Sequence, residues 1–472
     1  MTVVGPFVKP RPPRFWVVVL AAVFALLQLA NVTGRDTPDT RNYLSYALSP
    51  RGASKHEAAT ATIDYACAGR ASIARRDQSV NVVHFREPSP AGRVVEECRR
   101  DQRGWVSKRL SAGQTAGHTV PFMPPRFLRI FEARPGYPVF LVPFITVLGV
   151  KWGLWTSSVL ITVTGGVLAF LVLRTLCAPT LAALTGQALF YVLPCGTTAM
   201  RPMTEGLLLT LTLAALWGCA LALEGRTRAA TVLVGGSLAA LFAVKPSQAL
   251  FLGLCLAGAC AVLGIRRGGP RQPLRRLARP LREVGVVAAC GVAVTLLAAK
   301  VLGHPSESES LQDLLTAHFS RPDRSRPWSD FLSLEVDFWV EWLRRELWQP
   351  FFPTALLAGA WGALRHRPAF GVFLVAGALT GVLNQAGHPD IDIYGDRLIV
   401  LAWVLPVVGL PLLLEQVLRP RVRGLDTVPG PLRTDAEPNT AMDTAMDTGT
   451  GAGTGAGTGA GTGAGLDAGV AR

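Results

Sequence analysis

The sequence predicts an all-α polytopic membrane protein with about ten transmembrane helices and one further juxtamembrane or re-entrant helix. Three observations predict this class. Half of the 472 residues are hydrophobic, only 17% are charged, and the apolar residues fall in long unbroken blocks. A block of roughly 17 to 25 apolar residues is long enough to cross a bilayer as a helix. This composition excludes soluble enzyme folds.

The apolar blocks define the expected helices in chain order. They span residues 15–31, 137–150, 152–174, 178–195, 204–223, 229–248, 249–265, 284–302, 351–364, 369–385 and 397–418. The block 137–150 is short for a span, so we expect it to lie at the membrane surface or to re-enter it. No convincing cleavage site follows the first block, so we expect an uncleaved first span.

Basic residues between the blocks predict the orientation. If 137–150 does not cross, the basic N-terminus and every short basic loop lie on one side, which the positive-inside rule makes the cytoplasm. These loops contain Arg174, Arg226, Arg228, the seven arginines of 266–282, Arg365, Arg367, Arg419, Arg421 and Arg423. The formal charge of +15 therefore reflects membrane topology, and no nucleic-acid partner is expected.

The same reasoning divides the chain. Residues 1–14 are expected to be a cytoplasmic N-terminus, and residues 15–423 a transmembrane domain with extracytoplasmic loops at 32–136 and 303–350. Residues 424–472 are rich in Gly, Thr, Ala and Asp, which is typical of a disordered low-complexity tail. The protein is thus expected in the cell membrane, as a multi-pass protein with both termini in the cytoplasm.

Two carboxylates, Asp36 and Asp39, follow the first expected span directly. One interpretation is a helix N-cap for a helix that begins near Thr40. The other is general acid/base chemistry, for which paired carboxylates are common equipment. Tyr43 lies four residues after Asp39, on the same face of a helix, and an aromatic ring beside a carboxylate suits sugar binding.

Cations occur where the membrane surface is expected. Arg129 and Arg134 precede the block 137–150, where they either anchor to phospholipid headgroups or bind a lipid-linked phosphate. Lys245 interrupts two apolar blocks, so its ammonium group must reach the interface or pair with an anion.

Two further outer segments contain charged residues at the starts of spans. Glu205 opens an apolar helix, where a carboxylate also complements the helix dipole. Asp396 and Arg397 open the last span. Arg397 either pairs with Asp396 or holds a phosphate at the membrane surface.

Only two of the eight cysteines, Cys67 and Cys98, lie in a long polar segment. In an oxidising compartment they are candidates for one disulfide, and otherwise they are two free thiols. The histidines are scattered without metal-ligand spacing, so no metal site is predicted. A divalent ion, Mg²⁺ or Mn²⁺, held by the outer carboxylates stays an open alternative.

The order and sidedness of these motifs resemble the GT-C superfamily of integral membrane glycosyltransferases, a group that includes polyprenyl-phosphate-dependent mannosyltransferases and ArnT-like enzymes. The matching pieces are the acidic loop after the first span, the Arg134 to Pro138 run, Thr204-Glu205, Lys245 and Asp396-Arg397. The acidic pair departs from the family, because it reads Asp-x-x-Asp rather than a tight Asp-x-Asp.

The resemblance implies inverting transfer of a sugar from a polyprenyl-phosphate donor to a cell-envelope acceptor on the extracytoplasmic face. Asp39 would be the general base and Asp36 would assist it or bind acceptor or metal. Arg397, Lys245, Arg134 and Arg129 would bind the donor phosphate, and Tyr43, Glu205 and Asp396 the substrates. The expected partners are membrane lipids and a glycan, lipid or protein acceptor, and no cofactor is certain.

Two other classes compete with this hypothesis. A transporter or lipid flippase would place polar residues at span centres and break helices in paired halves, whereas here the polar signals cluster at one face. A catalytically inactive scaffold of the same fold is the third candidate.

Overall fold

The computed structural model describes residues 12–268, 279–391 and 397–415, and within these ranges every regular element is a helix. The predicted all-α class is therefore confirmed. Seven of the described helices are long and apolar enough to cross a membrane. They are α1 (Pro13–Gln28) with the 3₁₀ turn η1 (Leu29–Asn31) that continues it, α6 (Gly136–Thr175), α9 (Thr204–Leu223), α10 (Thr227–Val244), α11 (Pro246–Gly268), α12 (Arg279–Val301) and α16 (Pro368–Ala386).

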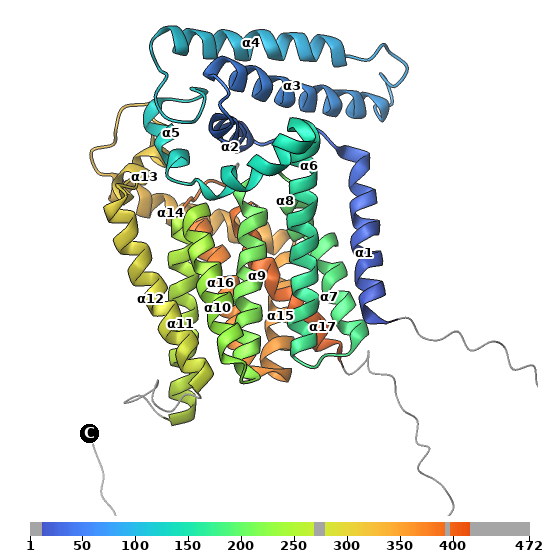
Figure 1. Cartoon of the computed structure of the whole chain (residues 1–472), viewed down its shortest axis with the longest axis vertical. Coiled ribbons are helices and arrows are strands. Elements are labelled where there is room, and N and C mark those ends of the chain that lie inside the picture. The colour runs from blue at the N-terminus through green and yellow to red at the C-terminus, as the bar shows by residue number, and fades with distance from the viewer. Residues whose placement is uncertain (1–11, 269–278, 392–396, 416–472) are drawn as a thin grey trace, which may run out of the picture. The chain divides into compact units, whose positions relative to one another are not determined.

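Shorter apolar helices complete the bundle. Two are α7 (Thr180–Val192) and the segment Leu398–Leu413, which consists of the 3₁₀ helix η3 (Leu398–Trp403) and α17 (Val404–Leu413). The helix α15 (Phe351–His366) packs against α17 and α16. The most extensive packing joins two pairs of successive helices, α9 with α10 and α11 with α12, and one pair separated in sequence, α15 with α17. Figure 1 shows these helices running roughly parallel to one another.

Helix α6 contains a break that separates two of the predicted blocks. Gly149 has φ 72° and ψ 174°, a backbone conformation that side chains other than glycine rarely adopt. A Cβ atom at Gly153 would lie 2.8 Å from backbone atoms of Ile145, so the arm after the break packs closely against the arm before it. The first arm, which contains the short block 137–150, lies at the upper end of the bundle (Figure 1).

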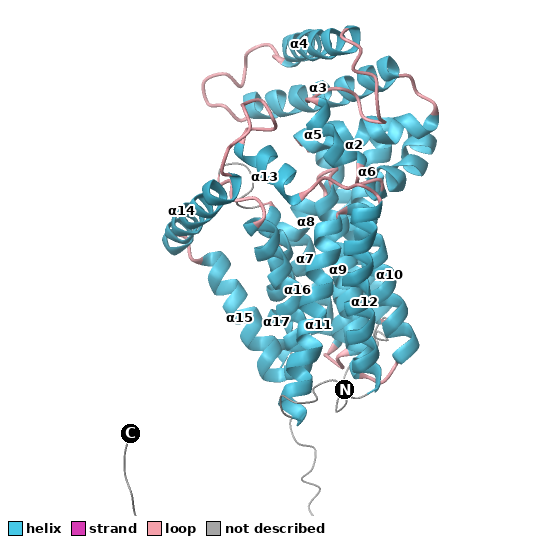
Figure 2. Cartoon of the chain, turned by 90° about the vertical axis from the view of Figure 1, so that its left-hand side faces the viewer, coloured by secondary structure: helices cyan, strands magenta, loops and turns pink. Residues whose placement is uncertain are grey.

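The polar loops gather at that same end. Helices α2 (Pro38–Leu48), α3 (Lys55–Ser79), α4 (Ala91–Ser111) and α5 (Pro125–Glu132) lie above the bundle in Figure 1, and α13 (Glu307–Leu315) lies near α5. The view in Figure 2 shows the same arrangement, with α8 (Pro194–Ala199) and α14 (Pro327–Trp348) toward this end. We call these helices, α2 to α5, α8, α13 and α14, the cap.

Arg126 joins two sequence-distant parts of the cap. Its guanidinium group on α5 donates to both carboxylate oxygens of Asp323 at 2.8 Å and to Glu309 of α13 at 3.4 Å. The same guanidinium group lies 4.3 Å from the ring centroid of Phe319. The segment between α12 and α15 is therefore attached to the first loop.

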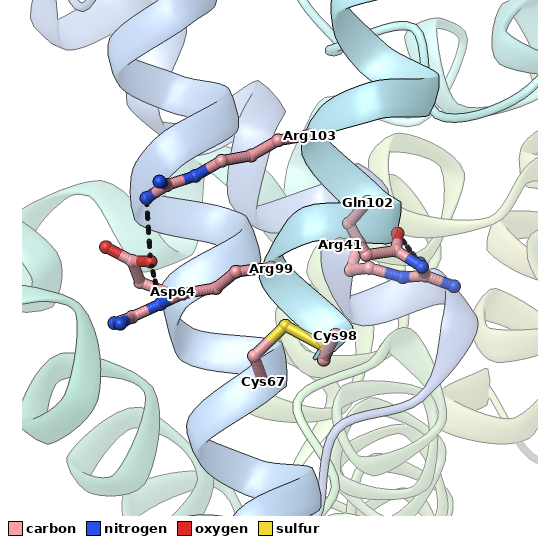
Figure 3. The surroundings of a disulfide bond; sticks show 7 residues. All are labelled: Arg41, Asp64, Cys67, Cys98, Arg99, Gln102 and Arg103. Atoms are coloured by element: carbon pink, nitrogen blue, oxygen red, sulfur yellow. Dashed lines mark hydrogen bonds and ion pairs between the residues drawn. A yellow bond between two sulfur atoms is a disulfide. The ribbon is translucent and has the colours of Figure 1, made fainter. Parts of the chain in front are cut away.

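Helices α3 and α4 pack as a hairpin that a disulfide crosslinks. Cys67 of α3 and Cys98 of α4 form an S–S bond across a sequence separation of 31 residues (Figure 3). Of the two alternatives that the sequence left open for these cysteines, the structure contains the bond. Ser54 and Glu57 form a capping box that starts α3, so the hairpin has a defined N-terminal end.

We expect loss of the disulfide to loosen the cap without unfolding the bundle. Closing a loop of this length contributes about 3–4 kcal/mol in the chain-entropy treatment. The double variant Cys67→Ser/Cys98→Ser should therefore be cleaved faster than wild type by trypsin within α3 and α4, as mapped by mass spectrometry. Equal cleavage rates would show that packing alone holds the hairpin. Cys177→Ser, which removes an exposed free thiol, is the control.

Candidate functional site

Neither Asp36 nor Asp39 caps the N-terminus of α2. Thr37 is the N-cap: its hydroxyl accepts from the Thr40 backbone N–H at 3.3 Å, and the Thr40 hydroxyl accepts from the Thr37 N–H at 2.9 Å. The interpretation of Asp36 or Asp39 as the N-cap is therefore wrong, whereas the helix expected to begin near Thr40 is present and begins at Pro38.

Arg397 bridges two carboxylates from distant parts of the chain. Its Nη2 donates to Oδ2 of Asp39 at 2.6 Å, and its Nε donates to Oε1 of Glu205 at 2.8 Å. All three side chains are largely withdrawn from solvent, with exposed fractions of 14% for Arg397, 20% for Asp39 and 4% for Glu205. We call these residues the bridge. Charge-assisted hydrogen bonds in such surroundings are strong and shielded from salt.

Glu205 is held in place from its own helix as well. It lies in the first turn of α9, where the helix dipole favours a carboxylate, and its Oε2 accepts from the Thr204 hydroxyl at 3.1 Å. The dipole interpretation of Glu205 therefore applies, together with a pairing to Arg397 that the sequence did not predict.

Two further cations lie beside the bridge, Lys245 and Arg134. Lys245 occupies the turn between α10 and α11, where desolvation lowers the pKa of its ammonium group to about 8, partly offset by Glu205. Arg134 interacts with the hydroxyl of Tyr43. With two carboxylates and three cations, the cluster can bind an anion.

The bridge lines two cavities that share residues. The inner cavity, of about 80 Å³, is lined by Asp39, Glu205, Arg397, Lys245 and Arg134, among others. The outer cavity, of about 350 Å³, lies between α2, α4 and α5 and shares Asp39, Arg397, Phe127 and His318 with the inner one. Asp39 therefore contacts both spaces.

Two histidines belong to the site although sequence reasoning left them aside as scattered. His318 pairs through Nδ1 with Oδ1 of Asp313 at 3.1 Å, and this hydrogen bond raises the pKa of the imidazole. Burial lowers the pKa of His388 to about 3, so it is neutral at physiological pH. The five-residue spacing from Asp313 to His318 is a weak signal, and nothing near His388 in the sequence indicates its neighbours.

The structure separates Asp36 from Asp39. Asp36 lies in another cavity, of about 580 Å³, together with Arg35, Arg201 and Tyr191, and burial raises the pKa of its carboxyl group. Arg397 also borders this cavity but Asp39 does not line it, so Asp36 and Asp39 line different cavities. The prediction that Asp36 assists Asp39 directly has no support in this geometry.

Tyr43 and Arg129 line neither the inner nor the outer cavity, so they lie apart from the substrate and phosphate sites predicted for them. Tyr43 is 1% exposed, and its ring packs edge-on against Phe131 and Tyr137 at centroid distances of 5.1 and 5.4 Å. The buried ring cannot stack on a sugar, so the prediction that Tyr43 binds substrate is wrong. Tyr43 instead interacts with Arg134 from the protein interior. Arg129 lines a separate cavity with His304. Asp396 lies outside the described residues.

No described group of three or more His, Cys, Asp or Glu side chains is arranged to hold a metal ion. Family models, curated proteins and solved structures were compared with the chain. None matches. The functional argument therefore depends on the geometry of the bridge and its cavities.

We expect the bridge to contribute to stability through its compensation of buried charge. Arg397→Gln leaves two carboxylates without their cation and should destabilise the protein by about 3–5 kcal/mol. The double variant Arg397→Gln/Glu205→Gln should recover part of that loss, measured by thermal unfolding in detergent. Arg99→Gln, which breaks an exposed pair with Asp64, should cost at most about 1 kcal/mol. A double variant no more stable than Arg397→Gln would contradict the charge argument.

Proposed function

We propose that the protein is a membrane glycosyltransferase that transfers a sugar from a polyprenyl-phosphate donor to a cell-envelope acceptor on the extracytoplasmic face. The observation that carries the proposal is the bridge: Asp39 is held by Arg397 beside Lys245 and Arg134, at the end of the bundle where the cap lies. A carboxylate base next to a cationic pocket is the equipment that transfer from a phosphate leaving group needs.

The geometry supports a division of labour at the bridge. Arg397 holds Oδ2 of Asp39, and Oδ1 has no hydrogen-bond partner in the part of the chain that the structure describes. Oδ1 would accept the proton of an acceptor hydroxyl as that oxygen forms a bond to the anomeric carbon. The bond from that carbon to the phosphate oxygen breaks on the opposite face, so the configuration inverts. Lys245 and Arg134 would bind the departing phosphate.

The bundle supports the topology that we propose for this function. Ten passes result from α1, the second arm of α6, α7, α9 to α12, α15, α16 and the η3–α17 segment. In this arrangement Arg174, Arg228 and Arg365 lie at the end opposite the cap, which the positive-inside rule places in the cytoplasm. The protein would then lie in the cell membrane with both termini cytoplasmic and the site outside.

Activity should depend on Asp39. Purified protein is incubated with a panel of polyprenyl-phosphate sugars, and release of polyprenyl phosphate is followed. We expect Asp39→Asn to lower turnover by a factor of about 10² to 10⁴, because the general base is lost. Asp64→Asn, which removes a carboxylate that pairs with Arg99 and Arg103 on the cap surface, should retain wild-type turnover. Full activity of Asp39→Asn would refute the assignment of the base.

The proposed sidedness can be tested by thiol labelling of intact cells. The exposed cysteines Cys177 and Cys290 are first replaced by serine. A membrane-impermeant maleimide should then label Asn81→Cys, between α3 and α4, and should label Glu224→Cys, between α9 and α10, only after lysis. The reverse pattern would place the cap in the cytoplasm.

A further inference from the structure

We infer that the outer cavity binds an anionic saccharide, meaning a sugar that bears a carboxylate or a phosphate group. Its role as the acceptor site rests on the proposed function, whereas its ability to bind such a ligand does not. The cavity volume, about 350 Å³, falls within the range of small-molecule sites. Asp39 lies on its wall, so a bound hydroxyl group could reach the proposed base.

Two buried polar atoms that belong to residues lining this cavity lack protein partners. Asn42 is 3% exposed, and its Oδ1 forms no hydrogen bond with the described part of the chain. Nη1 of Arg109 is also a buried atom that forms no hydrogen bond with the described part of the chain. A buried polar atom without a partner costs about 1–3 kcal/mol, and a ligand can supply the missing partner. One atom is an acceptor that suits a sugar hydroxyl, and the other is a donor that suits an anion.

The charge of the cavity wall also favours an anion. Arg397 is already neutralised by the bridge, so Arg41 and Arg109 supply the excess positive charge. Arg41 donates to the neutral amide of Gln102 at 2.7 Å. Neither Arg41 nor Arg109 forms a salt bridge with a carboxylate of the described residues. The carboxyl group of Asp36, whose pKa burial raises, interacts with Arg41 without forming a salt bridge, so it offsets the charge of Arg41 only in part. Guanidinium groups match carboxylate and phosphate geometry well.

Aromatic residues provide the surface for a sugar ring. Trp105 lines the cavity and is 65% exposed, and Phe122 and Phe127 contribute further apolar surface. A cavity with a few convergent polar groups and aromatic walls is typical of specific small-molecule sites. An indole face so placed can cover the apolar face of a sugar ring while its edge remains wet.

One face of α4 presents most of these groups together. Gln102, Trp105, Val106 and Arg109 follow the i, i+3, i+4, i+7 spacing and all line the cavity. The Cys67–Cys98 bond anchors the helix just before this face. Figure 3 shows the Arg41–Gln102 pair on one side of the disulfide and Asp64 with Arg103 on the other, which makes Arg103 a matched control on the same helix.

The binding test uses the full chain in lipid nanodiscs without donor. Saturation-transfer NMR titrations measure the dissociation constants of glucuronic acid, glucose 6-phosphate and glucose. Both anionic sugars should bind more tightly than glucose, and the better of the two identifies the acidic group. Arg109→Gln should weaken the anionic sugars about tenfold and leave glucose unchanged, because one charged hydrogen bond is lost. Arg103→Gln should have no effect.

A second variant guards against indirect effects of the first. Trp105→Ala should weaken all three sugars, because the ring surface is lost and the charge is retained. Each variant is compared with wild type by its thermal unfolding midpoint. Equal affinity for glucose and the anionic sugars, or equal effects of Arg109→Gln and Arg103→Gln, would overturn the inference.

The experiments distinguish failure of this inference from failure of the proposed function. If Asp39 proves necessary for donor turnover and anionic sugars do not bind the outer cavity, the inference is wrong and the proposed function stands. If anionic sugars bind in an Arg109-dependent manner and no donor is turned over, the binding site is supported and the proposed function is wrong.

Discussion

The structure depends on the burial of one guanidinium group, that of Arg397. A buried cation needs counter-charges and hydrogen-bond acceptors, since its unpaired desolvation would cost several kcal/mol. Asp39 and Glu205 provide both, and they come from α2 in the cap and α9 in the bundle. The Thr40 hydroxyl also donates to the Pro202 carbonyl at 2.9 Å, so α2 is joined directly to the turn before α9 and, through Arg397, to the first turn of α9. These contacts fix the base of the cap on the bundle.

The rest of the cap is built outward from this base. The disulfide holds α4 against α3, and Arg126 attaches the segment that contains α13 to α5. The disulfide and the ion pairs of Arg126 place Arg109 and His318 in the wall of the same cavity as Asp39. Arg397 borders the inner cavity, the outer cavity and the cavity of Asp36, so the central cation of the bridge also separates three spaces. One side chain therefore organises both the packing and the electrostatics of the site.

The candidate site was predicted in part. Asp39, Glu205, Lys245, Arg134 and Arg397 were selected because each lies where an apolar block begins or ends on one side of the expected topology, and the structure brings all five to one cavity. The interpretation of Arg397 changes: it pairs with Asp39 and Glu205, so it positions the proposed base rather than serving first as a phosphate ligand. Tyr43, Asp36 and Arg129 met the same sequence criteria and lie elsewhere. Tyr43 and Arg129 lie on helix faces that spacing along one segment cannot distinguish, and Asp36 precedes the N-cap of α2.

The sequence by itself determined the all-α class, most helix positions and the division between the blocks 137–150 and 152–174, because long apolar blocks act locally along the chain. It also indicated which charges lie near the membrane surface, since burial of an unpaired charge within a span is unfavourable. Only the tertiary structure decided which charges pair, that Tyr43 is interior, and that His318 and His388 join the site. Those outcomes depend on contacts between segments hundreds of residues apart, such as Asp39 with Arg397, for which no local pattern carries a signal.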